Sequence, residues 1–298
     1  MKRNPVLHRE LTYRNRAFSN AILIMVFDGI LAVFSLLYFY TISQNVIYSG
    51  EMDFSTMLKL YMLIATLEFF LFLLLTPALA AGSISGERER GTIDLLLTSK
   101  MSSWQIIWGK FTSSMYISGL LFTSSLPILS LVFVYGGVKL WDFLFLLLNL
   151  YVMVIFIGSI SIFFSALFAR VTVSMIVSYA TVAFLTGGTL LIEWLFYNLS
   201  TLKTIGTDKA AGVGSFIVLL MINPIVTFFS VLERQTGEMK ILKKIFERFG
   251  TDTSGFLINN WAVLSIVVQL LLSALLLVMA HWVLTPVHRR NKKPAPQE

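Results

Sequence analysis

The sequence predicts an all-helical protein that crosses a membrane several times. Of its 298 residues, 56% are hydrophobic and 13% are charged, and the mean hydropathy is +0.79. A soluble globular domain carries about 25% charged residues. The apolar runs are continuous and rich in leucine and phenylalanine, whereas the strands of a membrane barrel would alternate apolar and polar residues. Composition therefore favours a bundle of lipid-facing helices.

The same composition argues against several classes of site. The absence of cysteine excludes disulfides, thiol nucleophiles and cysteine-ligated metals. The three histidines, His8, His281 and His288, lie near the chain ends without metal-ligand spacing. Neither a phosphate-binding loop nor a Gly-x-Ser-x-Gly elbow is present. The net charge of +7 flanks apolar runs, which is typical of membrane topology rather than of nucleic-acid binding. We therefore expect no metal, no bound cofactor and no catalytic site in this chain.

Residues 1–20 precede the first apolar run and are basic. Lys2, Arg3, Arg9, Arg14 and Arg16 fall here, interleaved with a partial apolar stripe. This pattern predicts an amphipathic helix that lies in the cytoplasmic interface of the membrane. A polar segment of this length before a long apolar run is not typical of a cleaved signal peptide.

Six apolar segments are long enough to cross a bilayer, for which about 20 residues are needed. They cover about residues 21–42, 57–80, 104–134, 141–168, 171–196 and 256–284. Pro127 is expected to kink the third span, and Gly187-Gly188 lies in the fifth. Basic residues concentrate before the first span and after the last, which predicts that both termini are cytoplasmic.

The stretch 197–256, between the fifth and sixth spans, is predicted to lie outside. Within it, Val213 to Val231 is apolar and nearly long enough to span, but Asn223-Pro224 interrupts it. A seventh span would put the basic tail outside, against the charge pattern. A re-entrant pair of helical pieces broken at Pro224 is therefore preferred, and the seventh span remains the alternative. Residues 233–249 are expected to form an exposed amphipathic helix.

Two acids, Asp28 and Glu68, fall inside predicted spans. Ionisable groups in a membrane are costly and often functional, so a proton or cation site is one interpretation. Hydrogen bonding to neighbouring hydroxyl groups in the bundle interior is the other. Small and hydroxyl residues of the third and fifth spans are expected to mediate helix packing.

A charged turn, residues 86–99, separates the second and third spans. It begins Gly86-Glu87-Arg88-Glu89-Arg90-Gly91-Thr92 and is too polar there to enter lipid. Apolar residues then recur at helical spacing, at Ile93, Leu96 and Leu97. Thr92 suits a helix cap and Asp94 suits the positive end of the first turn. The pattern predicts a short helix along the cytoplasmic surface of the membrane.

This region resembles the loop after the second span of ABC-2 type permeases, the membrane subunits of one class of ABC transporters. The residues that carry the resemblance are Glu87-Arg88-Glu89-Arg90-Gly91-Thr92, Leu95-Leu96-Leu97, Ser102-Ser103 and Gly109-Lys110. The specific matches lie between about Ala81 and Lys110, and the layout of spans agrees over most of the chain.

The resemblance implies a single transmembrane domain over residues 1–298, and an exporter subunit in the cell membrane. Two separate ABC ATPase subunits would bind ATP and Mg²⁺, and a second copy or a homologous permease would complete the pathway. The segment 86–99 would be the coupling helix, resting in a groove of the ATPase. Its expected contact residues are Glu87, Arg88, Glu89, Arg90, Gly91, Thr92, Asp94, Leu95 and Leu96. The four charged residues would also meet the N-terminal helix.

Two other functions remain open from the sequence. An ATP-independent carrier or channel would use Asp28 and Glu68 as ion sites, but no internal repeat typical of such carriers is evident. A membrane-embedded enzyme is disfavoured by the scarcity of histidine, cysteine and clustered carboxylates. The transported substrate is not indicated.

Overall fold

The structure is a computed structural model that describes Glu10 and residues 18–49, 54–93, 102–134, 138–203, 217–236 and 260–285. All regular secondary structure in these ranges is helical. The helices are α2 (Phe18–Ser49), α3 (Phe54–Ala80), α4 (Ser85–Glu89), α6 (Ser103–Val134), α7 (Leu140–Leu167), α8 (Val171–Ala183), the π-helical turn η1 (Phe184–Gly188), α9 (Thr189–Lys203), α10 (Ile217–Leu220), α11 (Pro224–Thr236) and α14 (Trp261–Leu284). The prediction of an all-helical protein is therefore confirmed for the described residues.

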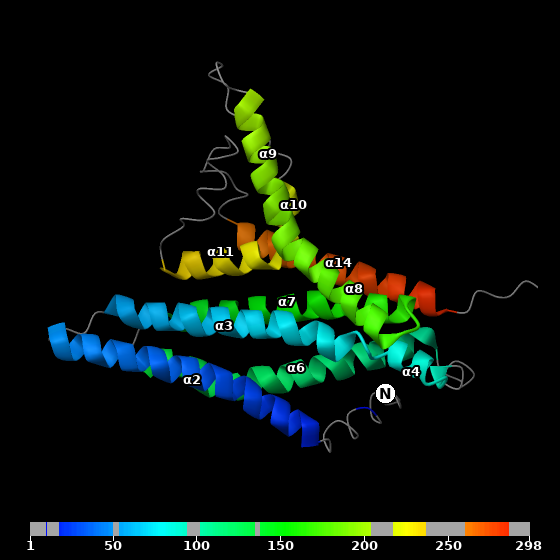
Figure 1. Ribbon diagram of the computed structural model, residues 1–298, viewed down its shortest axis with the longest axis horizontal. Coiled ribbons are helices and arrows are strands. Elements are labelled where there is room, and N and C mark those ends of the chain that lie inside the picture. The colour runs from blue at the N-terminus through cyan, green and yellow to red at the C-terminus, as the bar shows by residue number, and fades with distance from the viewer. Residues whose placement is uncertain are drawn as a thin grey trace, which may run out of the picture.

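Helix α7 lies at the centre of the bundle (Figure 1). It packs against α3, α6, α8, α11 and α14, and its sequence is apolar around nearly the whole circumference. A helix that is apolar on all sides needs other helices or lipid around it. Gly158 leaves room for a side chain of α6, since an added Cβ would overlap the terminal methyl of Met115. Small residues at such crossings are typical of helix packing in membranes.

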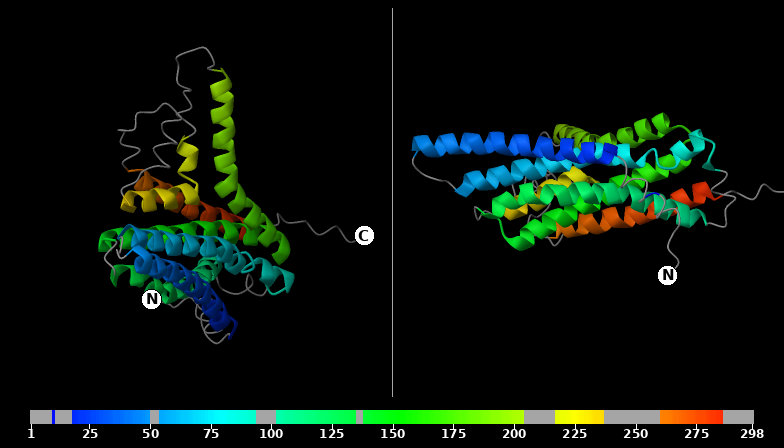
Figure 2. Two further views of the ribbon diagram at one scale, coloured as in Figure 1. Left: turned by 60° about the vertical axis from the view of Figure 1, so that its left-hand side comes forward. Right: turned by 90° about the horizontal axis from the view of Figure 1, so that it is seen from below.

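Helix α2 lies at the edge of the bundle and packs on α3 and α6 (Figures 1 and 2). Many of its large apolar side chains are exposed, such as Met25, Leu36 and Tyr40. An apolar surface of this extent on a long helix is what lipid would cover. The lipid-facing character predicted for the first span thus agrees with its position.

Five helical segments are long and apolar enough to cross a membrane. They are Phe18–Gln44, Met57–Glu89, Leu140–Leu167, Val171–Leu199 and Trp261–Leu284. The predicted third span also forms a helix, α6, which has 32 residues with Pro127 inside it. α6 is not among these five, which were found in the described residues alone. The structure therefore supports a multi-pass membrane protein, with five of the six predicted spans meeting this criterion.

The predicted fifth span is longer than expected and is not one regular helix. α8 passes through η1 into α9 and ends at Lys203, and α9 projects away from the bundle in Figure 1 and the left view of Figure 2. A π turn inserts an extra residue into the helical ladder and changes the helix direction. The sequence marked this place only through Gly187-Gly188.

The predicted break at Asn223-Pro224 is present. α10 ends before it and α11 begins at Pro224, where the ring suits the first helical turn. The Asn223 side-chain oxygen accepts hydrogen bonds from the backbone N–H groups of Ile225 (2.8 Å) and Val226 (3.3 Å). Its amide nitrogen donates to the Thr186 carbonyl and to Thr189 Oγ1, each at 2.8 Å. Of the amphipathic helix predicted at 233–249, residues 237–249 lie outside the described residues.

Candidate functional site

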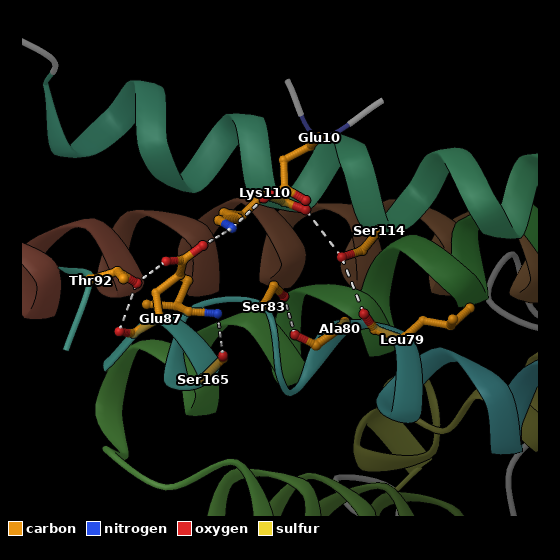
Figure 3. A network of polar contacts seen from close by, with 10 residues as sticks. Glu10, Leu79, Ala80, Ser83, Glu87, Thr92, Lys110, Ser114 and Ser165 are labelled. Atoms are coloured by element: carbon orange, nitrogen blue, oxygen red, sulfur yellow. Dashed lines mark hydrogen bonds and ion pairs between the residues drawn. The ribbon is translucent and has the colours of Figure 1, made fainter. Parts of the chain in front are cut away.

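The charged turn begins as a continuation of α3 and is held by α7. Ser165 Oγ on α7 accepts hydrogen bonds from the backbone N–H groups of Ile84 (2.9 Å) and Ser85 (3.0 Å). Figure 3 labels Ser165 among the polar contacts of this region. All three residues are fully buried. These N–H groups lie at the start of α4, and the first N–H groups of a helix have no carbonyl partner within that helix. One serine therefore fixes the place where the turn leaves α3.

The turn ends at Gly91, whose backbone has a φ of 69°. The Thr92 N–H donates to the Glu87 carbonyl (2.9 Å), and the Gly91 N–H donates to the Arg88 carbonyl (3.0 Å). This pair of bonds is the Schellman arrangement that ends a helix with a left-handed residue, usually glycine. The Gly-Thr step of the sequence is thus a helix stop. It lies within the segment 86–99 that the sequence predicts as the coupling helix, of which residues 94–99 lie outside the described residues.

Glu87 is joined to two other parts of the chain through Lys110 at the start of α6. The Lys110 ammonium lies 3.0 Å from Glu87 Oε1 and 2.5 Å from Glu10 Oε1. The Thr92 hydroxyl donates to the other carboxylate oxygen of Glu87 (Figure 3). Lys110 is 5% exposed, so this ion pair is largely shielded from the water and salt that would weaken it. The predicted contact between the charged turn and the N-terminal segment is made through Lys110.

Arg88 and Glu89 contact the turn between α7 and α8. Arg88 Nη1 donates to the Leu167 carbonyl at the end of α7 (3.4 Å). Glu89 Oε2 accepts from the Val171 N–H at the start of α8 (3.1 Å). Arg170, at the N-cap of α8, makes no side-chain cap, so Glu89 supplies it from another element. A carboxylate at this position also suits the positive end of the helix dipole.

The structure thus accounts for six of the nine residues expected to couple to a partner. Glu87, Arg88 and Glu89 contact the protein's own elements, Gly91 and Thr92 shape the turn, and Arg90 is exposed. The remaining three, Asp94, Leu95 and Leu96, lie outside the described residues. We call residues 84–92 with Lys110 and Ser165 the joint. It connects α3, α6, the α7–α8 turn and Glu10.

Sequence reasoning missed two residues of the joint. Ser165 gave no signal, because it is one of several serines in an apolar helix and its partner is 80 positions away. Lys110 belongs to the Gly-Lys pair that carries the family resemblance, but the sequence predicts no contact for its side chain. Its position about two helical turns into an apolar segment was the available clue, because a lysine buried there needs a carboxylate partner.

Asp28 and Glu68 lie apart from the joint, between α2, α3 and α6. Ser124 Oγ lies 3.1 Å from Asp28 Oδ1, and Ser125 Oγ lies 2.5 Å from Glu68 Oε1. Both serines belong to α6, so this helix contacts both acids with consecutive residues. The described residues contain no group of three or more histidine, cysteine, aspartate or glutamate side chains that could hold a metal ion.

Comparison with known families gives one match. The family model described as ABC-2 family transporter protein matches residues 12–285, which is most of the chain. No match was found among curated proteins.

Proposed function

Because the chain belongs to the ABC-2 family of transporter proteins, we propose that it is the membrane permease of an ABC exporter driven by separate ATPase subunits. Two ATPase subunits would bind ATP and Mg²⁺, and this chain would bind neither. Two permeases, identical or homologous, would enclose the pathway within the lipid bilayer. Nucleic acid has no part in this function.

The observation that carries the proposal is the joint. α4 is short, but its residues are fastened to four other parts of the chain, through Lys110, Ser165 and the α7–α8 turn. A force applied to α4 would therefore reach α3, α6, α7 and α8 together. That is the property required of an element that passes the motion of an ATPase to the spans.

Fewer residues of the charged turn would contact the ATPase than the sequence predicts. Glu87, Arg88 and Glu89 already have partners within the permease. We assign the ATPase contact to Arg90, which is exposed, and to the segment that contains Asp94, Leu95 and Leu96. The three preceding charges would transmit the force rather than receive it.

The proposed orientation puts the joint in the cytoplasm, with both termini on the same side. Arg88, Arg90, Lys110 and Arg170 then lie on the inner side, in agreement with the positive-inside rule. α6 would cross the membrane as the third span in chain order and bring the number of spans to six, since 32 residues extend about 48 Å. α10 and α11 would form the re-entrant outer segment.

Site-directed cross-linking tests this proposal. The chain has no cysteine, so a single cysteine can be placed without a background. We expect Arg90→Cys to cross-link to a co-expressed ATPase subunit that also co-purifies with the permease. Tyr48→Cys is the control and should not cross-link. Tyr48 lies near the C-terminal end of α2 and is 86% exposed. If no ATPase co-purifies, or only the control cross-links, the proposal is wrong and an ATP-independent carrier is favoured.

A further inference from the structure

The two acids in the spans are held by α6 in a way that the coupling function does not explain. Glu68 on α3 is fully buried, and its Oε1 lies 2.5 Å from Ser125 Oγ. Asp28 on α2 has its Oδ1 3.1 Å from Ser124 Oγ. Ser124 and Ser125 are consecutive on α6, so the two acids approach neighbouring positions of one helix. α2, α3 and α6 therefore meet at a pair of acidic side chains.

Ser124 and Ser125 each have one hydroxyl hydrogen but two acceptors within bonding distance. Ser125 Oγ is within bonding distance of Glu68 Oε1 and of the Phe122 carbonyl (3.0 Å). Ser124 Oγ is likewise near Asp28 Oδ1 and the Leu121 carbonyl (2.9 Å). A serine hydroxyl has one hydrogen and cannot donate to both acceptors. If each acid carries a proton, the acid donates to its serine and the serine donates to its carbonyl, so every contact is a hydrogen bond.

Among the residues that the structure describes, neither Asp28 nor Glu68 forms an ion pair with a cation. Among the described residues the ion pairs of Lys110 are made with Glu10 and Glu87, and Lys110 lies about 21 Å along α6 from Ser124. Glu68 Oε2 is buried and has no hydrogen-bond partner among the described atoms. Aromatic rings lie alongside: Phe69 stacks on Phe228 with centroids 4.3 Å apart, and Phe72 packs against Phe27 and Phe122. An unpaired carboxylate in such a place is strongly disfavoured.

We propose that Glu68 and Asp28 form a proton-binding site, in which both acids carry a proton while α2 and α3 are packed against α6. Release of both protons would put two negative charges across the α2–α3 contact and take one donor from each serine. α2 is the helix free to respond, because it lies at the edge of the bundle. Proton release would therefore loosen α2 from α3 and α6.

Other titratable groups on the elements around Glu68 do not replace this pair. They are Tyr38, Tyr40 and Tyr48 on α2, Lys59 and Tyr61 on α3, Lys110 and Tyr116 on α6, Asp142 and Tyr151 on α7, and Tyr179 on α8. Tyr61 already donates its hydroxyl hydrogen to Gln235 (2.9 Å).

Infrared difference spectroscopy of the full chain in lipid nanodiscs tests the site without any ATPase, so its outcome is independent of the coupling proposal. At neutral pH we expect carbonyl bands of protonated carboxylic acids that shift in D₂O. Glu68→Gln should remove one band and Asp28→Asn another, and both bands should disappear at alkaline pH. The amides keep the shape and a donor for each serine, so both variants are expected to fold.

Ser125→Ala provides a second readout that does not alter the acids. It should shift the Glu68 band, because the hydrogen bond is lost, without removing it. Absence of acid bands from the folded wild-type protein at neutral pH would overturn the proposal. Carboxylate bands that respond to Na⁺ instead would also overturn it, in favour of a cation site.

Discussion

Gly91 is the residue at which a single side-chain atom is expected to matter most. Its φ of 69° is left-handed, although an added Cβ would meet no atom within 4 Å. Gly91→Ala is therefore strained by backbone conformation alone, at roughly 1–2 kcal/mol. We expect normal insertion but reduced stimulation of ATP hydrolysis by the permease in the purified complex. Gly91→Asn is the matched control, since asparagine tolerates this conformation better. Equal loss in both variants would contradict the backbone explanation.

Lys110 is expected to be the residue of the joint whose removal costs most stability. Lys110→Met keeps much of the volume but leaves the carboxylates of Glu10 and Glu87 facing each other without the cation. Breaking a buried pair in this way costs on the order of 3 kcal/mol. Thermal unfolding in detergent should show a clearly lower midpoint. Adding Glu87→Gln to Lys110→Met should recover part of the loss. If the double variant is no better than Lys110→Met, the two residues are not coupled.

At the scale of helices, the contact of Glu89 with α8 makes a local prediction. Glu89→Ala removes the acceptor for the Val171 N–H, and loss of an N-cap costs about 1 kcal/mol. Hydrogen exchange in the first turn of α8 should become faster, while exchange in the middle of α7 stays unchanged. Arg90→Ala is the control, because Arg90 belongs to the same charge run but does not accept from the Val171 N–H. Faster exchange in both variants would show that the charge run, rather than the cap, stabilises α8.

A second prediction at this scale concerns the break before α11. Asn223→Ala removes the acceptor for two N–H groups and the donor to the carbonyl of Thr186. Asn223→Asp keeps the cap but loses the amide donor. We expect the alanine variant to lower the unfolding midpoint more than the aspartate variant does. If the aspartate variant were the less stable, the bonds to η1 and α9 would outweigh the cap.

The elements differ in how far the sequence could predict them. α7 and α14 follow from apolar composition alone, and the break at Pro224 follows from proline chemistry. The turn at Gly91 was visible as a Gly-Thr step, but its geometry was not. η1 and the roles of Ser165 and Glu89 depend on partners far along the chain, so local sequence patterns carry no signal for them. Local sequence patterns likewise carry no signal for which residues of α6 contact Asp28 and Glu68.

For the whole molecule, the central claim is that the joint carries motion from the ATPase to the far end of the bundle. Tyr48, near the C-terminal end of α2, and Trp141, at the start of α7, are both exposed. These two helix ends lie at the end of the bundle away from α4 (Figure 1). They are therefore suitable positions for spin labels on cysteines introduced into this cysteine-free chain. Their separation reports whether α2 moves relative to the central helix.

The most direct measurement is the distance between these labels by double electron–electron resonance in the assembled complex, with and without trapped ATP and Mg²⁺. We predict that nucleotide shifts the distance distribution in the wild-type background. The shift should be lost when Arg88→Ala and Glu89→Ala are combined, although the ATPase still binds. An equal shift in that background would show that motion reaches the spans by another route, and would contradict the account.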